Sequence, residues 1–161
     1  MKIRHAKVRD VPRMMDLINE FAREGLMLFR GPQSLFEDIR DFLVIVDDEN
    51  VVRGCGAFHV LWEDVGEIRA VAVERAFQGN HYGVQLVQEL IEEARELEIP
   101  RVYTFTYLPN FFKKMGFKIV RKEDLPQKMY AECSRCPKYF FCDEIAMKTE
   151  IEIPQQEASE K

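Results

Sequence analysis

The sequence lacks the features that mark membrane-spanning, secreted and nucleic-acid-binding proteins. No apolar run approaches the ~20 residues of a membrane-spanning helix, and the N-terminus, MKIRHAKVRD, carries no apolar signal-peptide segment. A formal net charge of −5 provides no basic face for general nucleic-acid binding. We therefore expect a cytoplasmic protein whose partners include neither a membrane nor a nucleic acid.

Two common nucleotide-binding motifs are also absent. The sequence contains neither Gly-x4-Gly-Lys-Ser/Thr nor the dinucleotide fingerprint Gly-x-Gly-x-x-Gly. With 161 residues, of which 47% are hydrophobic and 32% charged, the chain suits one globular domain with a substantial core. We expect a single domain over residues 1–151 and a disordered tail over residues 152–161, where polar residues dominate.

The stretch from Glu67 to Glu93 predicts a strand, a glycine-bearing turn and a helix in that order. The apolar run 68–73 is short and rich in β-branched residues, and the turn 78–83 contains two glycines. Apolar residues then recur at spacings of three and four, as in a helix: Val84, Leu86, Val87, Leu90, Ile91 and Ala94. Many such turns bind nothing. However, the first N–H groups of a helix lack partners and glycine admits a close approach, so we infer a pyrophosphate ligand.

The rest of the chain predicts a mixed α/β sheet. Asp10 is expected to cap a helix that Gly25 ends, and Ser34 to start a second helix whose Leu35, Ile39 and Phe42 point inward. A short helix is expected between Tyr107 and Gly116. The further strands are expected at 2–6, 43–46, 51–61, 101–106, 118–121 and 145–151.

Two motifs and this element order resemble the GNAT superfamily of N-acetyltransferases. After a strand ending in Val-Ala-Val, Gln78 and Gly83 match the outer positions of the acyl-CoA loop Gln/Arg-x-x-Gly-x-Gly/Ala, with His81 at the middle glycine. The segment 111–117, FFKKMGF, resembles the late motif Phe-Tyr-x-x-x-Gly-Phe. The resemblance extends over almost the whole chain and implies a GNAT fold, with a mixed central sheet flanked by helices.

The GNAT resemblance implies acetyl-CoA as the co-substrate. The turn would bind the pyrophosphate, and the edge of the strand 71–73 would pair with the pantetheine arm as a strand pairs with a peptide. A backbone N–H of Val71 or Ala72 would face the thioester oxygen. The implied CoA-binding residues are Val71, Ala72, Val73, Gln78, Gly79, Asn80, His81, Tyr82, Gly83 and Val84.

A narrower resemblance is to the acetyltransferase domain of N-acetylglutamate synthases, in a short, stand-alone form. Its marks are Arg30-x4-Leu35-x3-Ile39, the run 54–57 and Glu67 before the central strand. It implies an amino-acid N-acetyltransferase of arginine biosynthesis, with glutamate the first acceptor, and Leu28, Arg30 and Ala70 as substrate-binding residues. The guanidinium of Arg30 suits a carboxylate. The synthases' arginine and serine near the last strand are absent; Phe141 and Asp143 stand roughly there, and Arg135 or Lys138 could replace them.

The same resemblance implies two catalytic residues. Glu67 would act as the general base through a water, because the acceptor amine arrives protonated. Thr106 would protonate the leaving thiolate, with its neighbour Tyr107 as the alternative acid. Many GNAT enzymes use a tyrosine where this chain has Phe112, which carries no proton. The non-catalytic alternatives are that Glu67 is a solvated carboxylate at a strand end and that Thr106 is an ordinary strand residue.

Other functions remain open at this point. The acceptor could be a protein lysine, an N-terminus or an amine-bearing drug, or the chain could be a CoA-binding sensor without catalysis. GNAT domains often form dimers, so a homodimer is compatible with the sequence.

The sequence contains four cysteines, of which three are close together. Disulfides are not expected in a reducing cytosol. Cys133-x2-Cys136-x5-Cys142 beside Asp143 resembles a zinc site, but a closed site needs four ligands and only three are local. We therefore favour a cysteine-rich ordered loop, about residues 125–144, over a zinc site or a redox-active pair, and predict no metal ligands. Cys55 is expected to be a buried strand residue.

Overall fold

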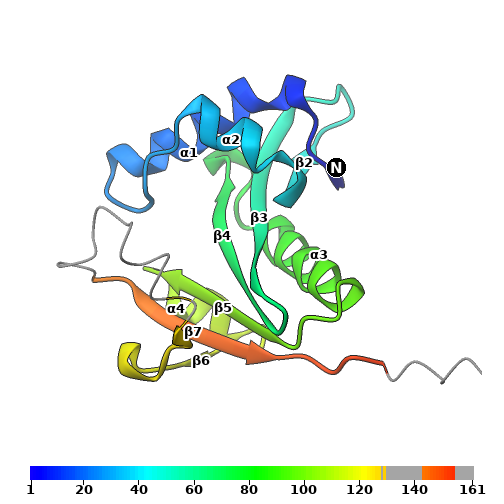
Figure 1. The fold of residues 1–161 in the computed structure, drawn as a ribbon. Coiled ribbons are helices and arrows are strands. Elements are labelled where there is room, and N and C mark those ends of the chain that lie inside the picture. The colour runs from blue at the N-terminus through cyan, green and yellow to red at the C-terminus, as the bar shows by residue number, and fades with distance from the viewer. Residues whose placement is uncertain (128, 130–142, 155–161) are drawn as a thin grey trace, which may run out of the picture.

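A mixed seven-stranded sheet flanked by helices forms the protein (Figure 1). The computed structural model describes residues 1–127, 129 and 143–154. The strands, in the spatial order β1-β2-β3-β4-β5-β7-β6, are β1 (Lys2–His5), β2 (Phe42–Val46), β3 (Val52–Trp62), β4 (Val65–Val73), β5 (Arg101–Thr106), β7 (Ile145–Glu150) and β6 (Lys118–Ile119). Within the described sheet, only β4 and β5 pair in parallel.

Four α-helices and four short 3-10 turns connect the strands in the described chain. The helices are α1 (Val11–Arg23), α2 (Pro32–Glu37), α3 (Tyr82–Glu96) and α4 (Pro109–Lys113). The 3-10 turns are η1 (Val8–Asp10), η2 (Ile39–Asp41), η3 (Arg75–Phe77) and η4 (Lys122–Asp124). This arrangement confirms the predicted mixed sheet and its order of elements. No helix in the described ranges has the length and apolar character that a membrane crossing requires.

The alternation of side chains along β2 separates two hydrophobic cores. Successive residues of a strand point to opposite faces of the sheet. Phe42, Val44 and Val46 pack with α1, whereas Leu43 and Ile45 pack with α3. The two helices therefore cover opposite faces, and all five residues of β2 are buried. A third, smaller core beside β5 contains Val65, Tyr103, Leu125, Met129 and Ala146.

The first helix begins and ends where predicted, with Asp10 at its N-cap position and Pro12 in its first turn. Gly25 adopts the left-handed conformation, with φ +76°, and the N–H of Leu26 bonds back to the carbonyl of Phe21 at 3.1 Å. The predicted side-chain cap by Asp10 is wrong. Its carboxylate accepts hydrogen bonds from the guanidinium of Arg4, at 2.7 and 3.0 Å, and from the N–H of Lys7, at 2.7 Å. Asp10 therefore joins β1 to the turn before α1.

The segment after α1 also departs from the prediction. The second helix begins at Pro32 rather than Ser34, because proline is well suited to the first position of a helix. The helix ends at Glu37, so Leu35 is the residue it buries, and Ile39 lies in the following 3-10 turn. Phe42 points into the core as predicted, but as the first residue of β2.

Candidate functional site

The two central strands separate halfway along β4. Strand β4 pairs with β5 only from Val65, opposite Arg101, to Ile68, opposite Thr104. Beyond Ile68, β4 pairs in the described sheet with β3 alone, as far as Val73 opposite Gly54. The edge of β4 from residue 69 to residue 73 is therefore open on its β5 side. Figure 1 shows the two strands diverging from this point.

A β-bulge lies at the start of the open edge. The pairing of β3 with β4 shifts between Cys55, opposite Ala72, and Ala57, opposite Arg69, so two residues of β4 face one residue of β3. Ala70, one of these two residues, has a φ of +57°, which is unusual for a residue with a side chain. Bulges bend a strand and redirect its groups, and residues held in this conformation cluster at functional sites. The bulge and the positive φ of Ala70 therefore lie next to Val71 and Ala72, whose N–H groups were expected to face the thioester carbonyl.

The turn before α3 keeps the backbone shape expected of an anion-binding loop. Gly79 has a φ of +86° and His81, the residue before the first turn of α3, has a φ of +63°. Histidine is one of the non-glycine residues enriched in this left-handed region, so His81 can adopt the conformation that a glycine would have at this position. The carbonyl of His81 accepts the N–H of Gln85 at 3.0 Å, which begins the helical ladder. Helical geometry leaves the N–H groups of Tyr82, Gly83 and Val84 directed out of the helix.

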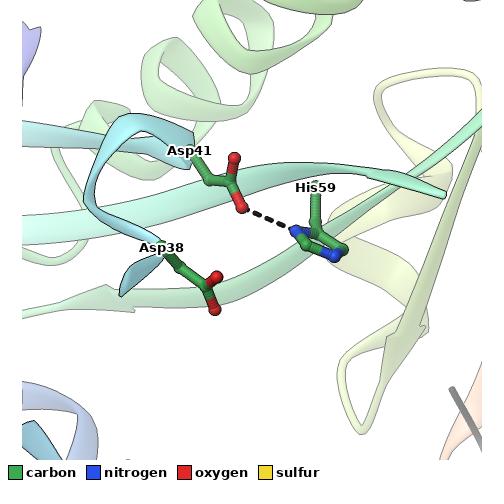
Figure 2. Close-up of side chains that lie close together, drawn as sticks. All are labelled: Asp38, Asp41 and His59. Atoms are coloured by element: carbon green, nitrogen blue, oxygen red, sulfur yellow. Dashed lines mark hydrogen bonds and ion pairs between the residues drawn. The ribbon is translucent and has the colours of Figure 1, made fainter. Parts of the chain in front are cut away.

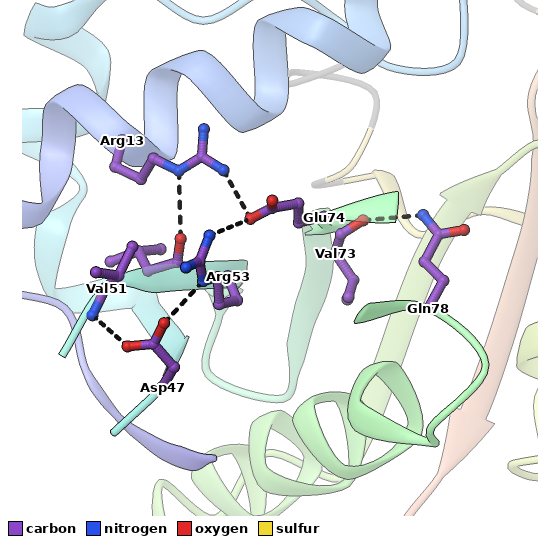
Figure 3. A network of polar contacts seen from close by, with 8 residues as sticks. Arg13, Asp47, Val51, Arg53, Val73, Glu74 and Gln78 are labelled. Atoms are coloured by element: carbon purple, nitrogen blue, oxygen red, sulfur yellow. Dashed lines mark hydrogen bonds and ion pairs between the residues drawn. The ribbon is translucent and has the colours of Figure 1, made fainter. Parts of the chain in front are cut away.

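Close packing explains the glycine at position 83. A Cβ atom there would lie 3.3 Å from the Cζ of Phe111 and 3.7 Å from a methyl group of Val73. Gly83 therefore allows α3 to approach both α4 and β4. Gln78, before the turn, donates a hydrogen bond from Nε2 to the carbonyl of Val73 at 2.9 Å (Figure 3). These contacts hold the turn against the end of β4.

An ionic network fixes the end of β4 to the first helix and to the β2–β3 turn (Figure 3). The carboxylate of Glu74 accepts hydrogen bonds from Arg13, at 2.8 Å, and from Arg53, at 3.1 Å, and Arg53 also binds Asp47 at 2.9 Å. Burial raises the pKa of Glu74, but the hydrogen bonds from Arg53 and Arg13 outweigh it and hold that pKa below its usual value. The open edge of β4 is thus anchored at its end as well as at its paired beginning.

Glu67 and Thr106 lie near the point where the strands separate. Glu67 is buried in β4, with 8% of its surface exposed, and Tyr103 of β5 lies opposite it. Thr106 is the last residue of β5 and is also buried. Its Oγ1 accepts the N–H of Leu108 at 2.8 Å, which leaves the hydroxyl proton available for donation. The Oη of Tyr107 instead donates to Asp143 at 2.5 Å.

Phe112 is a core residue. Its ring packs edge-on against Phe111 and Phe117, with centroid distances of 5.1 and 5.2 Å, and 5% of its surface is exposed. This packing gives the residue a structural reason to be phenylalanine, and it has no proton to supply to a thiolate.

Arg30 lies in the loop between α1 and α2 and is held at both ends. The side-chain amide of Asn19 binds the backbone of Arg30 twice, to its N–H at 3.0 Å and to its carbonyl at 3.1 Å. The Nη2 of Arg30 donates to Ser34 and Asp38, at 2.7 Å each. Its Nε is buried and has no hydrogen-bond partner within the described ranges of the chain. Leu28, two residues earlier, is 37% exposed.

A cluster of three side chains adjoins Arg30: Asp38, Asp41 and His59 (Figure 2). His59 of β3 binds the carboxylate of Asp41 through Nδ1 at 2.6 Å. The side chains each offer an atom within 4.8 Å of the others, as ligands of one metal ion would. However, Asp38 is already paired with Arg30 at 2.7 Å, and Arg69 lies 3.6 Å from it. Two guanidinium groups at this distance disfavour a further cation.

Sequence reasoning missed Asn19, Asp38, Asp41 and His59. A histidine in an otherwise apolar strand was the available signal for His59. Cys55 is buried as expected, and burial raises the pKa of its thiol to about 12. Cys133, Cys136 and Cys142, together with Arg135, Lys138 and Phe141, lie outside the described residues, so the cysteine-rich loop and the zinc alternative stay predictions.

The sequence of this chain is similar to those of known acetyltransferases. The profile of the acetyltransferase (GNAT) family matches residues 11–117. An uncharacterised N-acetyltransferase of Chlorobaculum tepidum is 37% identical over 145 residues, which cover 90% of this chain and 93% of that protein. An amino-acid acetyltransferase of Mycobacterium tuberculosis is 34% identical over 135 residues, covering 83% of this chain and 77% of the relative.

Solved structures with the same fold are also similar to this chain. The Rv2747 protein of Mycobacterium tuberculosis, in complex with CoA and the ligand NLQ, superposes with a TM-score of 0.83 at 28% identity and covers 94% of this chain and 100% of its own. The N-acetylglutamate synthase of Neisseria gonorrhoeae, complexed with CoA and N-acetyl-glutamate, gives a TM-score of 0.82 at 26% identity and covers 94% of this chain. The match covers 35% of that longer synthase.

Proposed function

The chain belongs to the acetyltransferase (GNAT) family, and we propose that it transfers the acetyl group of acetyl-CoA to the α-amino group of glutamate. It is an N-acetyltransferase of the amino-acid acetyltransferase type that uses acetyl-CoA as its co-substrate. The single observation that supports the mechanism best is the open edge of β4 beside the N-terminus of α3. A role in arginine biosynthesis would follow from glutamate as the acceptor.

Acetyl-CoA binding uses backbone groups on both sides of the strand separation. The N–H groups of the turn from Gly79 to Val84 receive the diphosphate, assisted by the partial positive charge of the N-terminus of α3. The amide-containing pantetheine arm pairs with the edge of β4 at Val71, Ala72 and Val73, in the place that β5 leaves open. The thioester then lies beside the bulge at Ala70.

The bulge supplies the group that stabilises the transition state. Attack on the thioester places negative charge on its oxygen, and a fixed backbone N–H that faces this oxygen stabilises the charge. We assign this donor to Val71 or Ala72, directly after the residue with positive φ. The loss of one such donor costs roughly 3 kcal/mol in other enzymes, a factor of about one hundred in rate.

Glu67 removes a proton from the acceptor ammonium, directly or through a water. The burial of this carboxylate beside the point where the strands separate supports the assignment. The neutral amine attacks the thioester carbon, the C–S bond breaks, and the hydroxyl of Thr106 donates a proton to the leaving thiolate. The hydrogen bond from the N–H of Leu108 stabilises the negative charge that forms on Thr106. No acyl-enzyme forms.

Arg30 recognises a carboxylate of the acceptor. Its Nη2 is held by Asp38 and Ser34, which fixes the direction of the guanidinium, and 14% of the side-chain surface is exposed. The planar guanidinium can then present a further N–H to the substrate. We also assign to acceptor binding Leu28, in the same loop, and Ala70, at the bulge of β4.

An acceptor panel tests the proposal. Thiol release from acetyl-CoA would be measured with glutamate, aspartate and glutamine, and with a lysine-containing peptide, a free peptide N-terminus and an aminoglycoside. We expect glutamate to give the highest kcat/KM, and we expect Glu67→Gln to lower kcat about 100-fold or more at neutral pH.

The panel also separates the alternatives. A preference for the peptide or the aminoglycoside would refute glutamate as the acceptor. Binding of acetyl-CoA without turnover on any amine would indicate a CoA-binding sensor. An unchanged kcat in Glu67→Gln would remove Glu67 from the mechanism.

A further inference from the structure

His59 and Asp41 form a hydrogen-bonded pair next to Asp38, the ion-pair partner of Arg30. The Nδ1 of His59 lies 2.6 Å from Oδ2 of Asp41, and the two side chains are 24% and 26% exposed (Figure 2). A carboxylate on Nδ1 fixes the orientation and the tautomer of the imidazole ring. Such a pair suits a group that accepts and releases a proton.

The strand register places this pair beside the proposed base. His59 of β3 lies directly opposite Glu67 of β4, in a run of regular antiparallel pairs from Ala57 opposite Arg69 to Val60 opposite Gly66. Side chains of directly opposed residues project from the same face, with Cβ atoms about 5 Å apart. His59 and Glu67 are therefore neighbours, and the ring of His59 reaches from Glu67 towards Asp41.

We propose that His59, held by Asp41, is a relay residue that receives from Glu67 the proton taken from the acceptor ammonium. This proposal rests on the proposed function, because it assigns a role to the same site. His59 does not touch the reacting atoms in this account. It acts through Glu67 and restores the carboxylate for the next turnover.

The protons and bonds balance in this scheme. The ammonium gives one proton to Glu67, which passes it to neutral His59, and the imidazolium is paired with Asp41. The amine forms its C–N bond as the C–S bond breaks. The amide nitrogen then loses its second proton while the thiolate gains one. His59 finally releases its proton to solvent, so each acetyl transfer liberates one proton.

The charges around His59 favour a relay over a metal site. Asp38 and Asp41 face it from the α2–η2 segment, and Glu67 and Arg69 lie on the adjacent strand. Arg30 neutralises Asp38 at 2.7 Å, and Arg69 adds positive charge 3.6 Å from that carboxylate. The other carboxylate, Asp41, is hydrogen-bonded to His59 at 2.6 Å (Figure 2).

The pH dependence of kcat/KM tests the relay. We expect His59→Gln and Asp41→Asn each to lower kcat about ten-fold near pH 7, less than the loss of a direct base. The deficit should shrink towards pH 9, where solvent accepts the proton readily. Added imidazole should restore activity to His59→Ala. His5→Gln is the matched control, because His5 lies on β1 with a 67% exposed side chain paired with Glu93.

A double-mutant cycle separates a relay from a purely structural role. If His59 acts through Glu67, then His59→Gln should have almost no further effect in a Glu67→Gln background. A pH-independent loss of activity, additive with Glu67→Gln and not rescued by imidazole, would overturn the relay. Activation of the wild-type enzyme by Zn²⁺ or Mn²⁺, or inhibition by EDTA, would also overturn it, in favour of a metal at the cluster.

The wild-type enzyme distinguishes failure of the relay from failure of the proposed function. Turnover with an amino acid by wild type, combined with a normal pH profile in His59→Gln, rejects the relay and retains the acetyltransferase. Absence of turnover on every acceptor rejects both. Circular dichroism of each variant verifies that it is folded. If His59→Gln does not fold, Asp41→Asn, which keeps the side-chain shape, provides the same test.

Discussion

Replacement of Asn19 by alanine should impair recognition of the amino acid without affecting acetyl-CoA. Asn19 lies on α1, and its side-chain amide binds the N–H and carbonyl of Arg30 at 3.0 and 3.1 Å. Alanine removes both bonds but changes no charge and leaves the Arg30 side chain intact. The loop would then be free to move the guanidinium out of its binding direction.

The structure allows an estimate of the effect. A hydrogen bond between neutral groups contributes roughly 1 kcal/mol net, so the two bonds together contribute about 2 kcal/mol. Because the loop is partly exposed to water, about half to three-quarters of this is lost from substrate binding. At 1.4 kcal/mol per factor of ten, we expect KM for the amino acid to rise about 5- to 12-fold.

Steady-state kinetics with each substrate varied in turn provide the assay. KM for acetyl-CoA should stay within about two-fold of wild type, as a criterion for selective loss of acceptor binding. Asn19→Asp is the matched variant: it keeps an acceptor for the N–H of Arg30 but loses the donor to its carbonyl, so its effect should be smaller than that of Asn19→Ala. Equal increases in both KM values, or a lower Tm with no change in either, would refute the role of Asn19 in positioning Arg30.

The remaining predictions concern the turn, the first strand and the buried thiol. His81→Val should lower the free energy of unfolding by about 1–2 kcal/mol in urea titrations, because a β-branched residue tolerates positive φ poorly. His81→Gly, the control, should not lower it. An equal loss of unfolding free energy in both variants would refute this explanation. Burial raises the pKa of Asp10, but hydrogen bonds from Arg4 and from the N–H of Lys7 outweigh this effect. The pKa of Asp10 in the folded protein therefore lies below its usual value. The ionised Asp10 therefore stabilises the fold above its unfolded-state pKa, and this stabilisation is lost as the pH falls through its folded-state pKa. Between about pH 5 and 3, the free energy of unfolding should fall more steeply for wild type than for Asp10→Asn. The same pH dependence in both proteins would contradict this prediction. Because burial raises the pKa of Cys55 to about 12, iodoacetamide at about pH 8 should label it in denatured but not in native protein, as read by peptide mass spectrometry; rapid native labelling would contradict the buried thiol.

Local patterns in the sequence were sufficient to predict the order of elements and the glycine-bearing turn before α3. The apolar spacing after residue 83 identified α3, and the glycines at 79 and 83 identified its N-terminus. Leu43 to Val46 formed a strand as predicted. These features depend on residues close together in the chain, which a periodic pattern records directly.

The features that the sequence did not predict depend on tertiary contacts. The bulge at Ala70 requires one extra residue in β4 relative to β3, which no pattern within β4 alone reveals. Asp10 was expected to cap α1, but Arg4 lies within reach once β1 is paired, and its two hydrogen bonds compete successfully for the carboxylate. The opposition of His59 and Glu67 likewise exists only after the register of β3 and β4 is set.

The central claim is that the N-terminus of α3 binds the diphosphate of acetyl-CoA while the open edge of β4 binds its pantetheine arm. Calorimetric titration with acetyl-CoA and with S-acetylpantetheine, which has the arm but not the diphosphate, tests it most directly. We predict one acetyl-CoA site per chain and binding of S-acetylpantetheine that is weaker by at least about 100-fold, as several charge-assisted hydrogen bonds require. No heat with acetyl-CoA, or equal affinity for the two thioesters, would contradict the account.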